Sequence, residues 1–143
     1  MKNVTFAIIK PDAVKNNFTG KIYNHILEKD FEIAACKLIK LSKEQAEHFY
    51  DIHKDKPFFN ELTTFMSSGK CMVLVLYKEN AVEEWRKTIG ATNPDEAEEG
   101  TIRKLYASSL GENAVHGSDS DKNAAKEIAF FFSVSEIIQN HTL

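Results

Sequence analysis

The sequence predicts an α+β fold in which helices cover a four-stranded, mostly antiparallel sheet. Short runs rich in β-branched and aromatic residues alternate with longer segments of helical periodicity. The chain has 143 residues, about the length of one domain, and no repeat, low-complexity tract or linker divides it. We therefore expect a single domain over residues 1–143, a ferredoxin-like sandwich with the helices over one face of the sheet.

Four apolar runs provide the expected strands. Residues 4–9 are β-branched and aromatic, and the Lys-Pro-Asp that follows ends the strand and delivers Lys10 to a loop. Residues 31–42 are apolar on both faces, and the continuous apolar run 70–77 suits a central strand. The run FFFS at 130–133 is expected to form the last strand, at an edge of the sheet.

Helical spacing marks the segments between these strands. Ile22, Ile26 and Leu27 recur at helical spacing after Thr19, which predicts a helix over 19–30. The S-x-x-Q capping box at 42–45 predicts a helix over 42–54. Further helices are expected over 58–69, over 79–90 with Asn80 as N-cap and Gly90 at the end, within 101–110, and over 119–128. The polar, acidic stretch 91–101 is expected to be a surface loop.

The charge balance argues against a polyanionic partner. The chain carries 18 basic and 21 acidic residues, a formal net charge of -3, so no global cationic field favours nucleic-acid binding. A phosphorylated small molecule is compatible with this balance, because a few well-placed Lys and Arg side chains are enough to bind it.

The sequence carries no mark of secretion or of a membrane span. The apolar stretch near the N-terminus ends at Lys10 and Pro11, too soon for a signal peptide or a transmembrane helix. Cys36 and Cys71 lie within apolar runs, where we expect buried free thiols that pack as small hydrophobic groups. These features favour a cytoplasmic protein.

Standard phosphate-binding and metal-binding motifs do not fit the sequence. The segment around Gly20 and Lys21 lacks the first glycine and the Ser or Thr of a P-loop, and no G-x-G-x-x-G is present. His48 and His53, at i and i+5, do not share a helical face, and no His and Cys cluster has zinc-site spacing. Ligation of a metal by histidine is not expected.

The segment NAVHGSDSD at 113–121 is the strongest local candidate for a site. Gly117 and Ser118 leave room for a group to approach His116 and to hydrogen-bond it, unlike the large apolar neighbours of a typical structural histidine. The pattern HGSD by itself is a weak signal, and it leaves a structural and a functional His116 equally open.

Four segments taken together resemble one enzyme family. They are IKPDAV at 9–14, YDIHKDKPFF at 50–59, ATNPDEAEEGTIR at 91–103 and NAVHGSDS at 113–120. In this order they resemble the nucleoside diphosphate kinases, and the similarity runs from residue 4 to about residue 134. The resemblance implies transfer of the γ-phosphoryl group of a nucleoside triphosphate, typically ATP, to a nucleoside diphosphate by a ping-pong mechanism that maintains NTP and dNTP pools.

The resemblance also implies a catalytic group. By this resemblance His116 is the nucleophile that becomes phosphohistidine, and Lys10 reaches the transferred phosphoryl group. Tyr50 matches the family tyrosine near the imidazole, while Ser118 and Glu127 match the residues that fix the histidine ring.

A second group is implied to bind the nucleotide, together with Lys10. Arg86 and Arg103 match the two arginines that hold the diphosphate, and Thr92 matches a hydroxyl donor to the same oxygens. Phe58 matches the aromatic residue on which the base stacks, and Asn113 matches the side chain that hydrogen-bonds the ribose 3′-hydroxyl.

The resemblance further implies Mg²⁺ as cofactor, carried mainly by the nucleotide phosphates, with no protein side chain required as metal ligand. The expected partners are ATP and other NTPs, NDPs, dNDPs and further copies of the chain in a tetramer or hexamer. The acidic run 94–99 is expected to be solvated surface. Two other functions, an RNA-binding module and a catalytically inactive scaffold, fit less well, because the strands lack RNP-type aromatics and the catalytic set is intact.

Overall fold

The computed structural model describes the backbone of residues 3–140 and the side chains of residues 3–137. The strands are β1 (Val4–Ile9), β2 (Glu32–Lys40), β3 (Lys70–Tyr77) and β4 (Val115–Gly117). The helices are α1 (Pro11–Lys15), α2 (Thr19–Glu28), α3 (Lys43–Phe49), α4 (Phe59–Met66), α5 (Ala81–Ile89), α6 (Ile102–Tyr106), α7 (Asp121–Phe131) and α8 (Val134–Asn140), with short 3₁₀ turns at Asp51–His53 and Pro94–Glu96.

The sheet has the order β2-β3-β1-β4, and each neighbouring pair is antiparallel. This arrangement confirms the predicted four-stranded α+β fold. The two central strands, β1 and β3, are the two most apolar runs of the sequence, because both of their faces are buried. His116 lies on the short edge strand β4 and pairs with Ile8 of β1.

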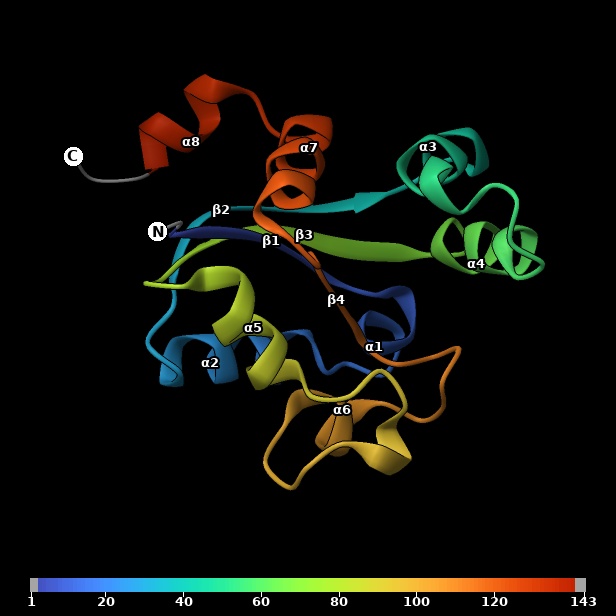
Figure 1. Ribbon diagram of the computed structural model, residues 1–143, viewed down its shortest axis with the longest axis horizontal. Coiled ribbons are helices and arrows are strands. Elements are labelled where there is room, and N and C mark those ends of the chain that lie inside the picture. The colour runs from blue at the N-terminus through green and yellow to red at the C-terminus, as the bar shows by residue number, and fades with distance from the viewer. Residues whose placement is uncertain (1–2, 141–143) are drawn as a thin grey trace.

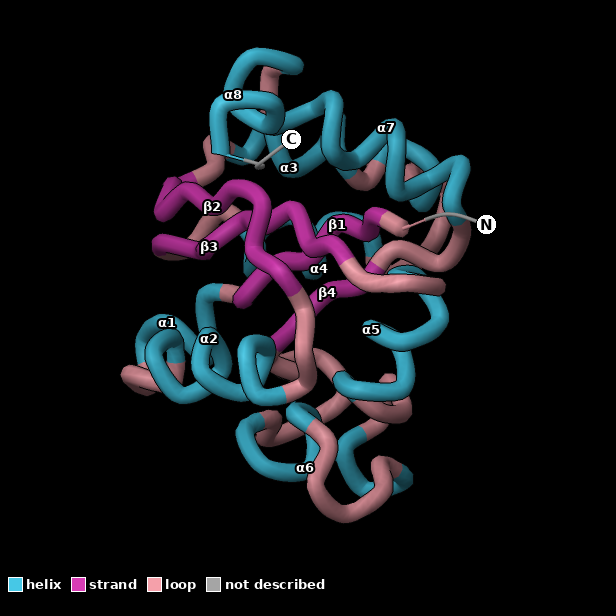
Figure 2. The backbone as a smooth tube through the Cα atoms, turned by 90° about the vertical axis from the view of Figure 1, so that its left-hand side faces the viewer, coloured by secondary structure: helices cyan, strands magenta, loops and turns pink. Residues whose placement is uncertain are grey.

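Helices cover both faces of the sheet, and the expectation of helices over one face is wrong. Alternate residues of each central strand point into different cores, as the two-residue period of a strand requires. Phe6 and Val75 belong to the first core, which lies between the sheet and α3, α4, α7 and α8. Ala7 and Leu74 belong to the second core, which lies between the sheet and α1, α2, α5 and α6. Figures 1 and 2 show these two helical layers with the sheet between them.

The run 130–133 is not the predicted edge strand. α7 continues through Phe131, whose ring stacks on Phe6 at 5.4 Å between centroids, so the aromatic run packs as part of a helix face. Ser133 then starts α8 with a capping box of its own. Its backbone N–H and its hydroxyl both donate to Glu136 Oε1, and its hydroxyl oxygen accepts from the Glu136 N–H. The place beside β1 is taken by β4 instead.

Several local predictions are confirmed and others need correction. The capping box of Ser42 and Gln45 is present, with hydrogen bonds of 2.9 and 3.0 Å. Asn80 does precede α5, but it has a φ of 56° and its side chain makes no capping hydrogen bond. Cys71 is buried, whereas Cys36 is exposed, because β2 is an edge strand and one of its faces is open in this chain.

Candidate active site

His116 is positioned by β4 with its side chain on the α3 and α7 side of the sheet. The imidazole packs among aromatic rings of the first core: its centroid is 6.0 Å from Phe6, 5.7 Å from Phe49 and 6.3 Å from Tyr50, each in an edge arrangement. The His116 side chain nevertheless remains 18% exposed. It is therefore held in place yet open to a ligand.

One carboxylate oxygen fixes the imidazole. Glu127 of α7 places Oε1 at 2.8 Å from His116 Nε2, and the same oxygen accepts a hydrogen bond from the Ser118 hydroxyl at 2.8 Å. Ser120 is the N-cap of α7, and its side chain accepts a hydrogen bond from the Asn123 N–H. The helix that starts there carries Glu127 on the face that points toward His116. The predicted grouping of His116, Ser118 and Glu127 is thus present in the structure.

Gly117 does not leave room for a ligand, contrary to the sequence-based interpretation. It faces the opposite side of the sheet from His116, where a Cβ would lie 2.8 Å from Trp85 Cδ1 and 3.1 Å from Ile89 Cδ1. The absent side chain lets the indole pack directly against β4, and Trp85 Nε1 donates to the His116 carbonyl at 3.1 Å. This glycine supports the backbone of His116 from the second core.

Replacing Gly117 by alanine is expected to destabilise the fold by about 1–3 kcal/mol, because the buried indole of Trp85 has no space to withdraw. Urea unfolding should show a lower midpoint with an unchanged slope. Gly111→Ala is the matched control, since a Cβ at Gly111 would meet nothing within 4 Å. Equal midpoints for the two variants would contradict this account of Gly117.

Lys10 and Asn113 meet at the end of β1. Lys10 is only 8% exposed, and its Nζ donates to Asn113 Oδ1 at 2.8 Å. The Asn113 amide nitrogen in turn donates to the Thr92 carbonyl at 3.3 Å, which ties the 91–101 loop to the end of the sheet. Burial and the nearby Arg103 charge lower the pKa of Lys10 to about 8.

Arg103 is buried and braces the backbone around Asn113. Its guanidinium donates to the carbonyls of Asn113, Gly90 and Val115, at 3.4, 3.0 and 2.9 Å. Burial and the neighbouring charge of Arg86 lower the pKa of Arg103 to about 10. Within the part of the chain that the structure describes, Arg86 itself makes no hydrogen bond or ion pair. Lys10, Arg86 and Arg103 thus form a cationic cluster, with Asp12 acting electrostatically on Lys10 and Asp119 interacting with Arg86.

The remaining predicted residues are Phe58, Thr92 and Tyr50. Phe58 precedes α4, is 47% exposed, and has its ring 5.7 Å from that of His53. Thr92 is exposed in the loop after α5. Tyr50 is buried, and its hydroxyl has no hydrogen-bond partner within residues 3–137. Burial raises the pKa of Tyr50, so this hydroxyl is a neutral donor.

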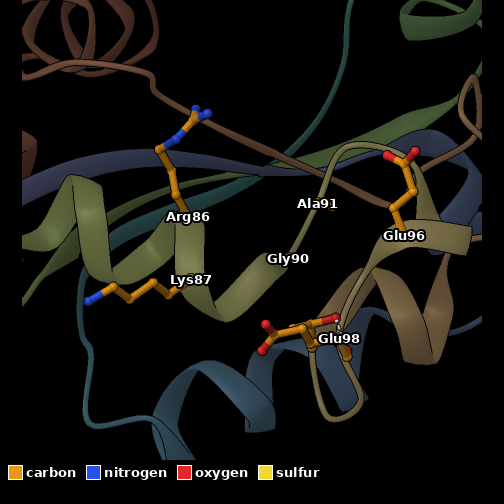
Figure 3. Close-up of a pocket in the computed structure, with 7 residues that line it drawn as sticks. Arg86, Lys87, Gly90, Ala91, Glu96 and Glu98 are labelled. Atoms are coloured by element: carbon orange, nitrogen blue, oxygen red, sulfur yellow. Dashed lines mark hydrogen bonds between the residues drawn. The ribbon is translucent and has the colours of Figure 1, made fainter.

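A cleft of about 290 Å³ adjoins the cationic cluster without containing the imidazole. Its lining includes Arg86 and Lys87 from α5, and Glu96 and Glu98 from the following loop. Figure 3 shows the Arg86 and Lys87 side chains pointing in different directions, with the two carboxylates across the cleft. Neither His116 nor Lys10 lines this cleft, so the cleft lies beside the candidate active site and does not form its centre.

Sequence reasoning missed Asp12. Its carboxylate is 5% exposed, and Oδ2 accepts the backbone N–H of Ala114 at 3.0 Å, across a separation of 102 residues. Asp12 is part of the IKPDAV segment, from which only Lys10 was taken as functional. A buried acid directly after a strand end is the signal that could have identified it.

Comparison with known proteins places the chain in one family. The family model for nucleoside diphosphate kinase matches residues 3–137. The chain belongs to the nucleoside diphosphate kinase family. As a member, it transfers a phosphoryl group between nucleoside tri- and diphosphates.

Individual relatives agree over nearly the full length. The nucleoside diphosphate kinase of Persephonella marina is 56% identical over 135 residues, 94% of this chain and 96% of that one. The enzyme of Chlorobium chlorochromatii is 53% identical over 137 residues, 96% of this chain and 98% of that one. The similarity to these enzymes therefore covers nearly the whole of this chain.

Two solved structures of this kinase family superpose closely. The enzyme of Aquifex aeolicus has a TM-score of 0.93 at 40% identity and covers 95% of this chain and 99% of its own. The halophilic enzyme of Halobacterium salinarum, solved in complex with CDP, has a TM-score of 0.91 at 34% identity, with 96% and 92% covered.

The described residues contain neither a cluster of metal ligands nor a membrane-spanning helix. Within residues 3–137, no three His, Cys, Asp or Glu side chains gather where they could hold a metal ion. None of the helices in residues 3–140 is both long and apolar enough to cross a bilayer. The carboxylate nearest the imidazole, Glu127, is already engaged by His116 and Ser118.

Proposed function

We propose that the chain acts as one kinase domain and carries the γ-phosphoryl group of ATP on Nδ1 of His116. The contact between Glu127 Oε1 and His116 Nε2, 2.8 Å long, is the observation that carries this proposal. A carboxylate at this distance holds the proton on Nε2, so the lone pair of the neutral ring lies on Nδ1. Nδ1 is then the nucleophilic nitrogen.

The first half-reaction follows from this tautomer. Nδ1 forms a bond to the γ-phosphorus while the bond to the oxygen bridging the β- and γ-phosphorus breaks, and ADP departs with that electron pair. The ring becomes cationic as the N–P bond forms, and the Glu127 carboxylate stabilises that charge. In the second half-reaction, a terminal phosphate oxygen of an NDP attacks the same phosphorus and His116 is released unchanged.

Positive side chains stabilise the charge on the phosphates. We assign Lys10 to the transferred group and Arg86 to the diphosphate, because both supply donors beside the imidazole segment. Arg103 commits three donors to carbonyls, so it adds its charge and its remaining N–H groups while bracing the turn that carries Asn113. Thr92 adds a hydroxyl donor to the same oxygens.

The nucleoside is bound at the exposed border of the site. We assign the base to the ring of Phe58, whose exposure leaves a face free for stacking, and the ribose 3′-hydroxyl to Asn113. The CDP bound to the halophilic relative supports an NDP as ligand of this kinase. Stacking on one ring tolerates every base, so we propose broad use of NTPs, NDPs and dNDPs.

Magnesium fits this site as part of the nucleotide substrate. The side chains proposed to bind the phosphates are cationic, and Glu127 contacts His116, so Mg²⁺ would be held mainly by the phosphates of the nucleotide. It would neutralise charge on the transferred group. We further propose a cytoplasmic homo-oligomer, tetramer or hexamer, on the family resemblance.

A labelling experiment without acceptor tests the proposed carrier. The purified protein is mixed with Mg²⁺ and γ-labelled ATP, and we expect one acid-labile, base-stable label per chain together with an equal amount of ADP. The labelled peptide should contain His116, and added GDP should convert the label to GTP. Binding of ATP without any label on the chain would overturn the phosphohistidine mechanism.

A further inference from the structure

The backbone at Ala114 adopts a conformation that residues with a side chain avoid. Its φ is 70°, and the Val115 N–H closes the turn onto the Asn113 carbonyl at 2.8 Å. Left-handed φ values bring Cβ close to the backbone and are disfavoured for alanine. Contacts from outside the turn must therefore stabilise this conformation of Ala114.

The Lys-Pro-Asp segment after β1 holds both polar groups of Ala114. The Lys10 N–H donates to the Ala114 carbonyl at 2.8 Å, and Asp12 Oδ2 accepts the Ala114 N–H at 3.0 Å. Arg103 donates to the carbonyls on either side, those of Asn113 and Val115. Of these contacts, the one from Asp12 is the only side-chain acceptor, so it alone fixes the direction of the Ala114 N–H.

The turn separates the two groups of site residues. On one side of the turn, Asn113 accepts a hydrogen bond from Lys10. On the other side, His116 follows two residues after Ala114. A change in the backbone conformation of Ala114 would rotate Asn113 relative to His116 and so separate the phosphate donors from the nucleophile.

Burial of the Asp12 carboxyl group costs free energy, and the proposed mechanism gives this residue no role. Its Oδ1 is buried and has no hydrogen-bond partner within residues 3–137, and burial raises the pKa of the carboxyl group. We propose that Asp12 is a positioning residue, which holds the strained turn at Ala114 so that Lys10 and Asn113 meet the phosphoryl group carried by His116. This inference rests on the roles proposed above for those three residues.

Variants at position 12 can separate two properties of Asp12, its hydrogen-bond acceptor oxygen and its negative charge. Asp12 also lies close enough to Lys10 to act on its ammonium group electrostatically. Asp12→Asn keeps an oxygen for the Ala114 N–H and loses the charge, whereas Asp12→Ala loses both. Ala114→Gly removes the steric penalty of the left-handed turn, so glycine should form the turn without Asp12.

The experiment is a double-mutant cycle of Asp12→Ala and Ala114→Gly, with Asp12→Asn alongside. We expect Asp12→Ala to lower kcat/KM for phosphoryl transfer by roughly 10–100-fold. The double variant should recover about tenfold, and Asp12→Asn should stay within a few-fold of the wild type. Glu99→Ala, which removes an exposed carboxylate, is the charge-matched control.

Hydrogen exchange of the Val115 amide provides a readout that is independent of activity. We expect it to accelerate in Asp12→Ala and to return toward the wild-type rate in the double variant. No recovery in the double variant, or equal losses of activity in Asp12→Asn and Asp12→Ala, would overturn the proposal. A wild-type chain that takes up no label defeats the phosphohistidine mechanism instead, and the exchange rates still decide whether Asp12 holds the turn.

Discussion

Replacing His116 by alanine is expected to lower kcat for phosphoryl exchange by roughly 10⁴-fold or more, because no other group can accept the phosphoryl covalently. The loss should appear in both half-reactions, with the affinity for ADP kept within a few-fold, since the phosphate and base contacts lie elsewhere. Stopped-flow kinetics and calorimetric titration with ADP measure the two quantities separately.

The matched control is His48→Ala. The His48 side chain is 70% exposed and lies 3.9 Å from Glu44, whereas the ring of its neighbour Phe49 packs against His116. This variant should keep wild-type kcat. Free imidazole should partly restore exchange to the His116→Ala variant, because its ring can occupy the vacated space. Normal turnover without His116 would rule out the histidine carrier.

Replacing Lys10 by methionine is expected to lower kcat/KM by roughly 10²–10³-fold, the usual effect of removing one preorganised donor from a developing charge. Methionine keeps the length and apolar volume of the side chain, so the packing at the end of β1 is preserved. Steady-state kinetics with ATP and GDP measure the loss. Lys15→Met, at an exposed position, is the control and should leave the rate unchanged.

The same lysine predicts a pH dependence. Its pKa in the free protein is lowered to about 8, so the ammonium group loses its proton as the pH rises through that value. For the wild type, kcat/KM should therefore fall above pH 8, while kcat declines at higher pH because bound phosphates favour the protonated amine. In Lys10→Met this alkaline limb should be absent. An unchanged alkaline limb in the variant would assign it to another group.

The central strands and most helices could be predicted because local pattern and final environment agree. Residues 6–9 and 71–77 are continuously apolar, and in the fold both faces of these strand segments are largely buried. The strand predicted at 130–133 is wrong because Phe131, at the end of α7, and Phe132, directly after it, pack into the same core without joining the sheet. The residues that follow determine the structure of this run, because Ser133 and Glu136 form a capping box that starts a new helix.

Pattern could identify the segment of His116 but not the direction of its side chains. Which face Gly117 occupies depends on the pairing of β4 with β1, and that register becomes clear only when Ile8 lies opposite His116. The role of Asp12 depends on a contact across 102 residues, which no local spacing encodes. The family resemblance supplied the candidate functional residues, whereas the residues that hold these candidates in place could be found only in the structure.

The contact between Trp85 and the His116 carbonyl gives this chain a built-in optical reporter. Trp85 is the single tryptophan, and its indole N–H bonds the residue proposed to carry the phosphoryl group. A phosphohistidine would add nearly two negative charges on the other side of the same short strand. The ultraviolet emission of the unlabelled protein would then change with its phosphorylation state, and the two half-reactions could be timed without any added dye or isotope.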